Sequence, residues 1–198
     1  EYQKQRSLAN NSAVYHGKPP VGTFMEEWLS IYHSHSGERG IFNRKAAKDK
    51  VAENSRRRTQ YIEFGCNPCS EIILRPYQFC NLSEVVVRHD DTLETLKEKV
   101  KIATIFGTYQ ATLTDFKYLR KIWKDNCQEE ALLGVSLTGI MDHHVLSKTT
   151  DAKKWLQEMK EVAINTNEEW AERLGINPAT AITCVKPSGT VSQLVDSA

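Results

Sequence analysis

The sequence predicts a mixed α/β fold, and three observations support this class. Apolar residues recur at helical spacing, most clearly over 93–103 and 156–170. Short β-prone runs are interspersed with these segments, and residues 181–185 are typical of a buried strand that leads into a loop and a helix start. With 198 residues, of which 40% are hydrophobic, the chain is long enough to form one domain with a real core.

The N-terminal part is expected to hold one strand and two helices. The predicted elements are a strand at 13–15, a helix over 23–34 and a polar, basic helix near 44–55. The first helix follows from Phe24, Trp28 and Ile31, which recur at helical spacing. The run Arg56-Arg57-Arg58 is interpreted as a solvated face rather than a ligand site.

Two strand-like runs occupy the middle of the chain, at about 70–74 and 79–87. The four residues between them predict an antiparallel pair in which Ile73 lies opposite Cys80. On that pairing Cys69 would lie on the order of 13 Å from Cys80, at about 3.3 Å per residue. This exceeds the roughly 7 Å Cα separation that a disulfide tolerates. The two thiols are therefore expected to have different tasks, with the partner of Cys80 elsewhere.

The second half is expected to place helices around a buried core. Asp91 and Glu94 form a capping-box pattern before an apolar helical stripe. Asp151 is expected to cap a long helix that Gly175 ends. The remaining expectations are a helix over 115–125, a closely packed interior segment over 134–146, and the buried strand over 181–185.

Composition excludes several classes of protein. A formal net charge of +1 argues against a non-specific polyanion binder. No apolar run approaches the roughly 20 residues that span a bilayer, and the start Glu1-Tyr2-Gln3-Lys4 is not a signal peptide. The missing initiator Met and the end at Ser197-Ala198 predict a piece of a longer polypeptide. Five cysteines in a chain of this size favour a reducing cytoplasm, and Cys127 and Cys184 are interpreted as structural.

The most informative motif is Asn67-Pro68-Cys69-Ser70-Glu71. On an extended backbone, side chains two residues apart project to one face, so Asn67, Cys69 and Glu71 are expected to point together. A sulfur capable of redox chemistry would then lie beside an amide and an acid/base. The alternative is that Cys69 is a buried structural thiol. Glu71 weighs against it, because a carboxylate on the same face is costly to bury without a partner.

Cys66 and Cys69 also form a CxxC, which is compatible with a redox dithiol or half of a zinc site. Zinc lacks further ligands, because there is no second CxxC and His143 and His144 are adjacent. No metal site is expected. A thioredoxin-like pair requires a helix directly after the motif, whereas the β-prone run 72–74 follows it.

A second candidate site lies over residues 186–191, where Pro187-Ser188-Gly189-Thr190 follows a predicted strand. Gly189 would let the backbone approach an anion, and Ser188 and Thr190 would add hydroxyl donors. The N–H groups of a helix's first turn favour phosphate. Ser-Gly turns that cap helices are common, so an ordinary cap is the alternative.

Together these motifs resemble the large catalytic subunit of ribonucleotide reductase. The matching pieces, in the order of the family, are Leu8-Ala9-Asn10-Asn11-Ser12, Gly40-Ile41-Phe42-Asn43-Arg44, Asn67-Pro68-Cys69-Ser70-Glu71, Cys80-Asn81-Leu82-Ser83, Leu133-Gly134-Val135-Ser136-Leu137-Thr138-Gly139 and Lys186-Pro187-Ser188-Gly189-Thr190. The resemblance covers nearly the whole chain. Asn-Pro-Cys and the short interval from Cys69 to Cys80 look most like the adenosylcobalamin-dependent (class II) branch, particularly its monomeric triphosphate reductases.

The resemblance implies part of a ten-stranded α/β barrel. A finger loop, about residues 65–75 here, would carry the radical cysteine into its centre. Cys69 would become a transient thiyl radical that abstracts the ribose 3′ hydrogen. Glu71 would act as general base at the 3′ hydroxyl, and Asn67 would hydrogen-bond the ribose. Cys80 would be one of two thiols that reduce the 2′ position and end as a disulfide.

The resemblance also implies that Pro187, Ser188, Gly189 and Thr190 hold the substrate phosphates. N-terminal and C-terminal portions of the family's enzyme are expected to be absent from this chain. They include the second redox thiol, the effector-binding region and the C-terminal cysteine pair. Only the tail of the substrate-specificity loop is expected, around Arg6 to Asn11. Cys66 has no expected counterpart in the family.

The implied cofactor is adenosylcobalamin, and the alternative is a radical supplied by a separate metal-containing subunit. The implied partners are a ribonucleoside tri- or diphosphate, a thioredoxin-like reductant and a complementing N-terminal reductase segment, with no nucleic-acid polymer and no membrane. Two other functions stay open. One is a catalytically incomplete remnant or interaction domain, and the other is a stand-alone thiol redox protein that uses Cys66 and Cys69.

Overall fold

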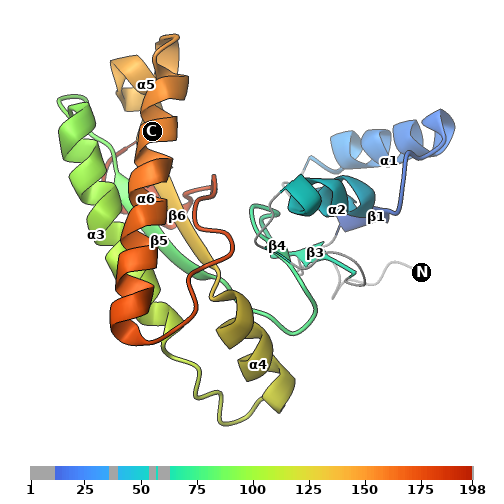
Figure 1. Cartoon of the computed structure of the whole chain (residues 1–198). Coiled ribbons are helices and arrows are strands. Elements are labelled where there is room, and N and C mark those ends of the chain that lie inside the picture. The colour runs from blue at the N-terminus through green and yellow to red at the C-terminus, as the bar shows by residue number, and fades with distance from the viewer. Residues whose placement is uncertain (1–11, 36–39, 54–56, 58–62, 198) are drawn as a thin grey trace. The chain divides into compact units, whose positions relative to one another are not determined.

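A computed structural model of the chain (Figure 1) describes residues 12–35, 40–53, 57 and 63–197. Its elements are β1 (Ser12–Tyr15), α1 (Val21–Ser34), β2 (Gly40–Asn43), α2 (Arg44–Glu53), β3 (Gly65–Cys66), β4 (Ile73–Leu74), β5 (Asn81–Val86), α3 (Leu93–Ala111), α4 (Lys121–Glu130), β6 (Leu133–Thr138), the 3-10 helix η2 (Ile140–Asp142), α5 (His144–Lys148), α6 (Ala152–Leu174) and α7 (Thr190–Leu194). The chain divides into two compact units, Glu1–Pro76 and Tyr77–Ala198. The proposed tail of the specificity loop, Arg6 to Asn11, lies outside the described residues.

The first unit begins with a β–α–β arrangement. β1 and β2 pair in parallel, with Ser12 opposite Gly40, and α1 connects them. Phe24 on the inner side of α1 lies 6.4 Å from the Tyr15 ring, measured between centroids. The predicted strand at 13–15 and the predicted helices at 23–34 and 44–55 are therefore confirmed as β1, α1 and α2.

The first unit ends with a short hairpin. β3 and β4 are antiparallel, with Gly65 opposite Leu74 and Cys66 opposite Ile73. The predicted pairing of the runs 70–74 and 79–87 is therefore wrong. The turn lies before Ile73 rather than after it, because Pro68 favours a tight turn within the motif itself.

The second unit is built on a parallel pair. β5 and β6 run side by side from Asn81 opposite Leu133 to Val86 opposite Thr138. α3 and α6 pack against each other, and α3 packs on both strands, so that helices cover one face of the sheet (Figure 1). The core lies in this layer and consists of apolar side chains such as Val85, Leu96, Val100, Leu133, Val135, Met159 and Ala163. The prediction of a closely packed segment over 134–146 is confirmed for its first part, since β6 is almost wholly buried, and is wrong for η2, where Met141 is 65% exposed.

Residues 181–184 extend this sheet beyond β6. The Leu133 N–H donates to the Ala181 carbonyl at 3.0 Å, and the Cys184 N–H donates to the Val135 carbonyl at 3.0 Å. Among the described residues, this extension forms a single bridge, between Val135 and Thr183. The predicted buried strand is therefore correct in position but shorter than expected, and Val185 is 81% exposed.

Helix ends in the second unit differ from expectation by a few residues. The capping box of α3 joins Thr92 and Thr95 rather than Asp91 and Glu94. The helix predicted at 115–125 is α4, which starts only at Lys121. Asp151 occupies the position before α6 without a side-chain capping bond, so its predicted role is wrong. The predicted end of α6 at Gly175 is confirmed, with a left-handed φ of 66°.

The fold class is confirmed as mixed α/β, whereas the barrel stays a prediction. The described residues hold six strands in three two-stranded sheets. Within residues 12–197, apart from the gaps given above, no helix combines the length and the apolar character needed to cross a membrane.

Candidate active site

The Asn-Pro-Cys motif forms a β-turn at the tip of the β3–β4 hairpin. The Ser70 N–H donates to the Asn67 carbonyl at 3.0 Å, the bond that defines such a turn. Asn favours the first position of a β-turn and Pro68 the second, where its fixed φ fits. Ser70 follows with a φ of 64°, in the left-handed region. The turn therefore follows from local sequence.

Asn67 closes this turn from both sides. Its N–H donates to the Ile72 carbonyl at 3.3 Å, and its side-chain Oδ1 accepts from the Ile72 N–H at 3.0 Å. The predicted extended backbone over Asn67, Cys69 and Glu71 is therefore wrong, and these side chains do not alternate along a strand. The turn instead presents Cys69 as its third residue, where the side chain is exposed.

Glu71 lies directly after the turn and differs from Cys69 in its surroundings. The residue is half-buried, and both carboxylate oxygens are shielded from solvent. Its neighbour Ile72 is buried at 7% exposure, and Phe64 on the other side of the hairpin is fully buried. The hairpin thus combines an exposed thiol with a shielded carboxylate two residues away.

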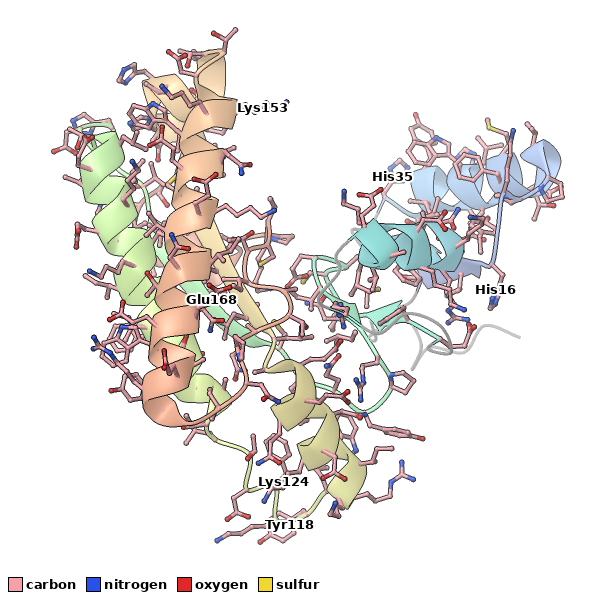
Figure 2. All side chains as sticks on the ribbon, in the orientation of Figure 1. His16, His35, Tyr118, Lys124, Lys153 and Glu168 are labelled. Atoms are coloured by element: carbon pink, nitrogen blue, oxygen red, sulfur yellow. The ribbon has the colours of Figure 1, made fainter. Side chains whose placement is uncertain are left out.

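Two arginines fix the base of the hairpin, and sequence reasoning missed both. Arg57 is buried, donates to the Ile73 carbonyl at 2.9 Å and lies with its guanidinium 5.1 Å from the Phe64 ring centroid. The interpretation of the run Arg56-Arg57-Arg58 as a solvated face is therefore wrong for Arg57, and its other two residues lie outside the described part of the chain. Arg44 donates through Nε to the Phe64 carbonyl at 2.8 Å, and its Nη1 lies 3.2 Å from His16 Nε2. Figure 2 labels His16, which directly follows β1.

The first cysteine of the CxxC, Cys66, lies in strand β3. Cys66 is half-buried, and its Sγ lies 3.5 Å from the Ser70 hydroxyl. A turn and then a strand follow Cys69, and a helix N-terminus does not, so the helix dipole that activates thioredoxin-like thiols does not act here. None of the five cysteines, all of which lie in described segments, forms a disulfide. Among the described residues no cluster of three or more His, Cys, Asp or Glu side chains could hold a metal ion.

In the second unit, Cys80 directly precedes β5. It is half-buried, and the Asn81 N–H and Nδ2 both donate to the Leu132 carbonyl, at 2.9 and 3.0 Å. Alternation along the strand places Cys80 on the same face as Glu84, opposite the face that carries Val85 into the helical core.

The segment before Cys80 is held by aromatic and buried polar contacts. The Phe79 ring stacks on Trp123 with centroids 4.6 Å apart, and Tyr77 packs edge-on against the same indole. The Phe79 N–H donates to Cys127 Sγ at 3.3 Å, and Cys127 is buried, which confirms its predicted structural role. These contacts fix the backbone that leads into Cys80.

Glu84 is a carboxylate that sequence reasoning did not single out. Its Oε1 is buried, and among the described residues it has no hydrogen-bond partner. In the register of the sheet it lies opposite Ser136 of β6. The four-residue interval from Cys80 is the signal that could have found it, since both residues fall on one face of an extended strand.

The predicted phosphate loop begins next to the sheet face that carries Glu84 and Ser136. The Lys186 N–H donates to the Ser136 hydroxyl at 3.1 Å, and α7 begins at Thr190. The Ser188 hydroxyl is buried and has no hydrogen-bond partner among the described residues. No atom lies within 4 Å of where a side chain at Gly189 would start, so that side of the loop is open. Cys80, Glu84, Ser136 and the loop are thus linked through one face of the second unit.

The comparisons with known proteins agree with the motifs. No family model matches the chain. It is 30% identical over 190 residues to the adenosylcobalamin-dependent ribonucleoside-triphosphate reductase of Lactobacillus acidophilus, which covers 81% of this chain and 25% of that protein. The enzyme of the same description from Lactobacillus leichmannii is 24% identical over 222 residues, with 96% of this chain and 28% of that protein covered.

A crystal structure of a B12-dependent (class II) ribonucleotide reductase shares the fold. It has a TM-score of 0.70 at 22% identity, and the match covers 98% of this chain and 30% of that chain. The chain therefore spans about a quarter of the length of the reductases that it matches. The resemblance drawn from the motifs is confirmed: the chain is homologous to a segment of the class II, adenosylcobalamin-dependent ribonucleotide reductases.

Proposed function

We propose that this chain supplies the part of a class II ribonucleotide reductase barrel that carries the radical thiol and the substrate phosphate loop. The observation that carries the proposal is the position of Cys69, exposed at the tip of a turn that Asn67 closes. Residues 65–75 would form the finger loop of that barrel. The reaction would convert a ribonucleoside triphosphate, or a diphosphate, into its 2′-deoxy form.

The chemistry of the turn would begin with hydrogen abstraction. Cys69, as a thiyl radical, would take the hydrogen atom from C3′ of the ribose, so that the sulfur becomes a thiol and the radical moves to the sugar. Glu71 would accept the proton of the 3′ hydroxyl, and its shielded oxygens suit a base that works away from bulk water. The Asn67 amide would donate to a ribose hydroxyl through Nδ2, since its oxygen already holds Ile72.

Reduction of the 2′ position would require two thiols. The 2′ oxygen leaves as water, and two electrons and the protons come from a thiol pair that ends as a disulfide. Cys80 would be one member of the pair, and the other would come from a complementing N-terminal reductase segment. The Cys69 thiol would return its hydrogen atom to C3′, which regenerates the thiyl radical and leaves a closed-shell product. A thioredoxin-like reductant would then restore the two thiols of the pair.

The substrate phosphates would bind at Pro187, Ser188, Gly189 and Thr190. The open side of Gly189 supports a close approach to the backbone N–H groups. The Ser188 hydroxyl supports the same assignment, because a phosphate oxygen would give it the hydrogen bond that it lacks among the described residues.

Adenosylcobalamin would supply the radical when it is bound, as the descriptions of the homologues imply. No residue of the described part of the chain is assigned here to bind the corrin ring of the cofactor. What the chain offers is the exposed Cys69 thiol as the hydrogen-atom donor. The reaction would take place in a reducing cytoplasm, where these thiols stay available.

The proposal is tested by substituting Cys69→Ser in a complex reconstituted from this chain and an N-terminal reductase segment, with adenosylcobalamin added. Loss of deoxynucleotide formation is expected. Cys66→Ser is the matched control, and it is expected to keep activity because Cys66 has no assigned step. Unchanged turnover by Cys69→Ser would favour a non-catalytic remnant. A reversible disulfide between Cys66 and Cys69, seen by mass spectrometry, with turnover unaffected by Cys80→Ser, would favour a thiol redox protein.

A further inference from the structure

In the second unit, no helix among the described residues covers the segment 183–185, which lies next to β6. Parallel strands normally have both faces buried, because crossover helices pack on them. Here α3 and α6 pack over β5 and β6, as Figure 1 shows. Residues 183–185, next to β6, border a pocket of about 550 Å³. The layer formed by α3 and α6 therefore covers β5 and β6 but leaves residues 183–185 uncovered.

The pocket is an open apolar groove alongside α6. Its lining is mainly aliphatic and includes Val100, Val135, Leu137, Ile140, Leu156, Met159 and Val185. Leu156 is 46% exposed and Val185 is 81% exposed, so the apolar lining continues to the surface on both sides. We call this surface, with the lysines described next, the α6 groove. Because its apolar lining is exposed at Leu156 and Val185, the groove can take an apolar segment of another chain.

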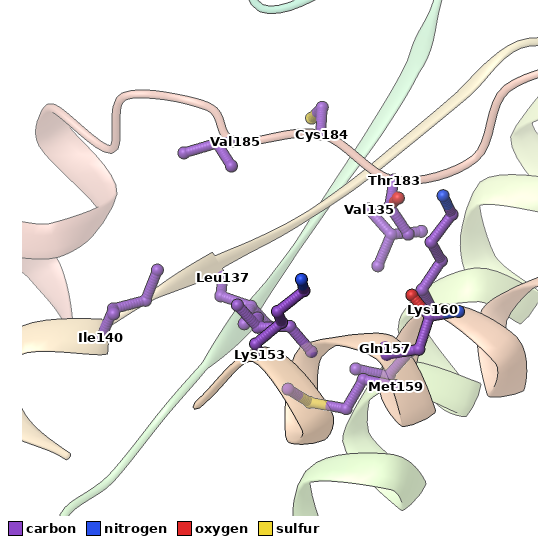
Figure 3. Close-up of a pocket in the computed structure, with 12 residues that line it drawn as sticks. Val135, Leu137, Ile140, Lys153, Gln157, Met159, Lys160, Thr183, Cys184 and Val185 are labelled. Carbon is purple, nitrogen blue, oxygen red and sulfur yellow. The ribbon is translucent and has the colours of Figure 1, made fainter. Parts of the chain in front are cut away.

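Two lysines stand at the edge of the α6 groove. Lys153 and Lys160 lie seven residues apart on α6, which corresponds to about 10.5 Å along a helix. Figure 3 shows both side chains rising from α6 on the side of residues 183–185. Within the described part of the chain neither takes part in an ion pair, whereas Lys97 on the neighbouring α3 pairs with Glu158.

The spacing along α6 indicates what would fill the groove. Lys153, Leu156, Gln157 and Lys160 have the spacing i, i+3, i+4, i+7 and therefore lie on one face of α6, with Leu156 between the two lysines. Where one helix packs into an apolar groove, apolar residues fill the groove and the surrounding charges select a partner of opposite sign. A partner here would place carboxylates about two turns apart.

We propose that the α6 groove docks an amphipathic helix whose apolar face is flanked by Asp or Glu residues, contributed by a reductase segment outside this chain. The proposal rests on the proposed function only for the source of the helix. The helix would complete the layer over residues 183–185 and neutralise Lys153 and Lys160. By covering Val185 it would also support the start of the phosphate loop at Lys186.

The test uses two labelled synthetic helices of about 18 residues and the full 198-residue chain. Both peptides carry leucines at i, i+3, i+4 and i+7; one has glutamates on the flanks with a seven-residue spacing, and the other has lysines there. Fluorescence anisotropy is expected to show the acidic peptide binding at least about tenfold tighter than the basic one at low salt. The double variant Lys153→Glu, Lys160→Glu is expected to reverse this preference.

Two further variants test whether the groove itself binds the peptides. Lys154→Glu is the matched control, because Lys154 is adjacent in sequence but does not line the groove, and it is expected to leave the preference unchanged. Leu156→Asp is expected to weaken both peptides, with circular dichroism as the check on folding.

Several outcomes would overturn the proposal. They are equal affinity for the two peptides, no binding of either at about 1 mM, and an effect of Lys154→Glu as large as that of the double variant. Displacement of the acidic peptide by dodecanoate would indicate a lipid site instead. Self-association of the chain in sedimentation velocity that Leu156→Asp abolishes would indicate a second copy as the occupant. None of these results depends on catalysis, so the proposed function can fail or stand separately.

Discussion

The side-chain oxygen of Asn67 accepts a hydrogen bond from the Ile72 N–H at 3.0 Å, across the turn that presents Cys69. The residue proposed to contact the ribose therefore also shapes the loop that carries the thiol. Any substitution of Asn67 will act on both, and the structural part can be measured without substrate.

Asn67→Ala is expected to loosen the turn, because it leaves the N–H of the buried Ile72 without its acceptor. An unsatisfied buried donor costs about 1–3 kcal/mol. Hydrogen exchange of the Ile72 amide should accelerate roughly tenfold for each 1.4 kcal/mol lost. Asn67→Asp keeps an acceptor at the same place and is expected to keep most of the protection. Equal exchange rates in the wild type and in Asn67→Ala would contradict this role.

Alanine substitutions of Gly139 and Gly175 distinguish two costs to the free energy of unfolding, that of a left-handed backbone and that of a steric clash. Both have positive φ, 81° and 66°. A side chain at Gly139 would place Cβ 2.4 Å from the Val87 carbonyl oxygen, whereas nothing lies within 4 Å at Gly175. Gly175→Ala is expected to lower the free energy of unfolding by about 1 kcal/mol, the cost of left-handed backbone for an L residue. Gly139→Ala is expected to cost a further 1–3 kcal/mol, roughly, from overpacking.

Urea denaturation of both glycine variants provides the measurement. Equal costs for Gly139→Ala and Gly175→Ala would mean that the Val87 carbonyl moves away freely. The close approach of Gly139 to Val87 would then not help to fix the end of β6.

Long periodic segments could be predicted from the sequence because their signals are local. α6 shows an apolar stripe and ends at a glycine that adopts a left-handed φ, and both features lie within a few residues of each other. The motifs of the candidate site were equally local. The turn at Asn67 and Pro68 also has a local signal, because proline after asparagine favours a β-turn over the extended backbone that side-chain alternation requires.

Pairing and burial could not be predicted in the same way. β5 lies next to β6 although 46 residues separate Val86 from Leu133, and no local pattern specifies that register. Arg57 belongs to a run of three arginines, and its burial depends on the Phe64 ring and the Ile73 carbonyl. Nothing in the sequence around Glu84 distinguishes it from other strand residues, because its position opposite Ser136 depends on the pairing of β5 with β6.

Asp91 is expected to contribute stability that is lost in acid. Burial raises the pKa of Asp91, but hydrogen bonds from the Lys99 ammonium, the Arg88 N–H and the Thr95 hydroxyl lower it, and the balance holds this pKa below its usual value of 3.8. A folded-state pKa below the unfolded one stabilises the fold above the unfolded pKa. This contribution should fall as the pH drops from about 4 through the lower folded value.

The measurement is the free energy of unfolding against pH for the wild type, Asp91→Asn and the control Asp90→Asn. Asp91→Asn is expected to be less stable at neutral pH and to show a shallower loss between about pH 4 and pH 2. Asp90→Asn should follow the wild type. A loss in acid of the same size in Asp91→Asn would assign the acid sensitivity to other carboxylates.

Glu84 and Glu130 are expected to respond in opposite directions to replacement by leucine. The buried Glu84 Oε1 has no hydrogen-bond partner among the described residues, whereas the Glu130 carboxylate accepts from Gln78 Nε2 at 2.5 Å. An unsatisfied buried polar atom costs about 1–3 kcal/mol, so Glu84→Leu should raise the free energy of unfolding by an amount of that order. Glu130→Leu should lower it by a similar amount, because it removes the carboxylate that accepts this hydrogen bond from the buried Gln78.

Urea denaturation of the isolated chain decides between the two signs. A stabilising Glu84→Leu is the behaviour of a polar group that is present for a partner other than the fold, since sites that bind or react often sacrifice stability. Destabilisation by Glu84→Leu of the same size as by Glu130→Leu would show instead that Glu84 supports the sheet. It would also remove the link between Cys80 and the phosphate loop that runs through Glu84 and Ser136.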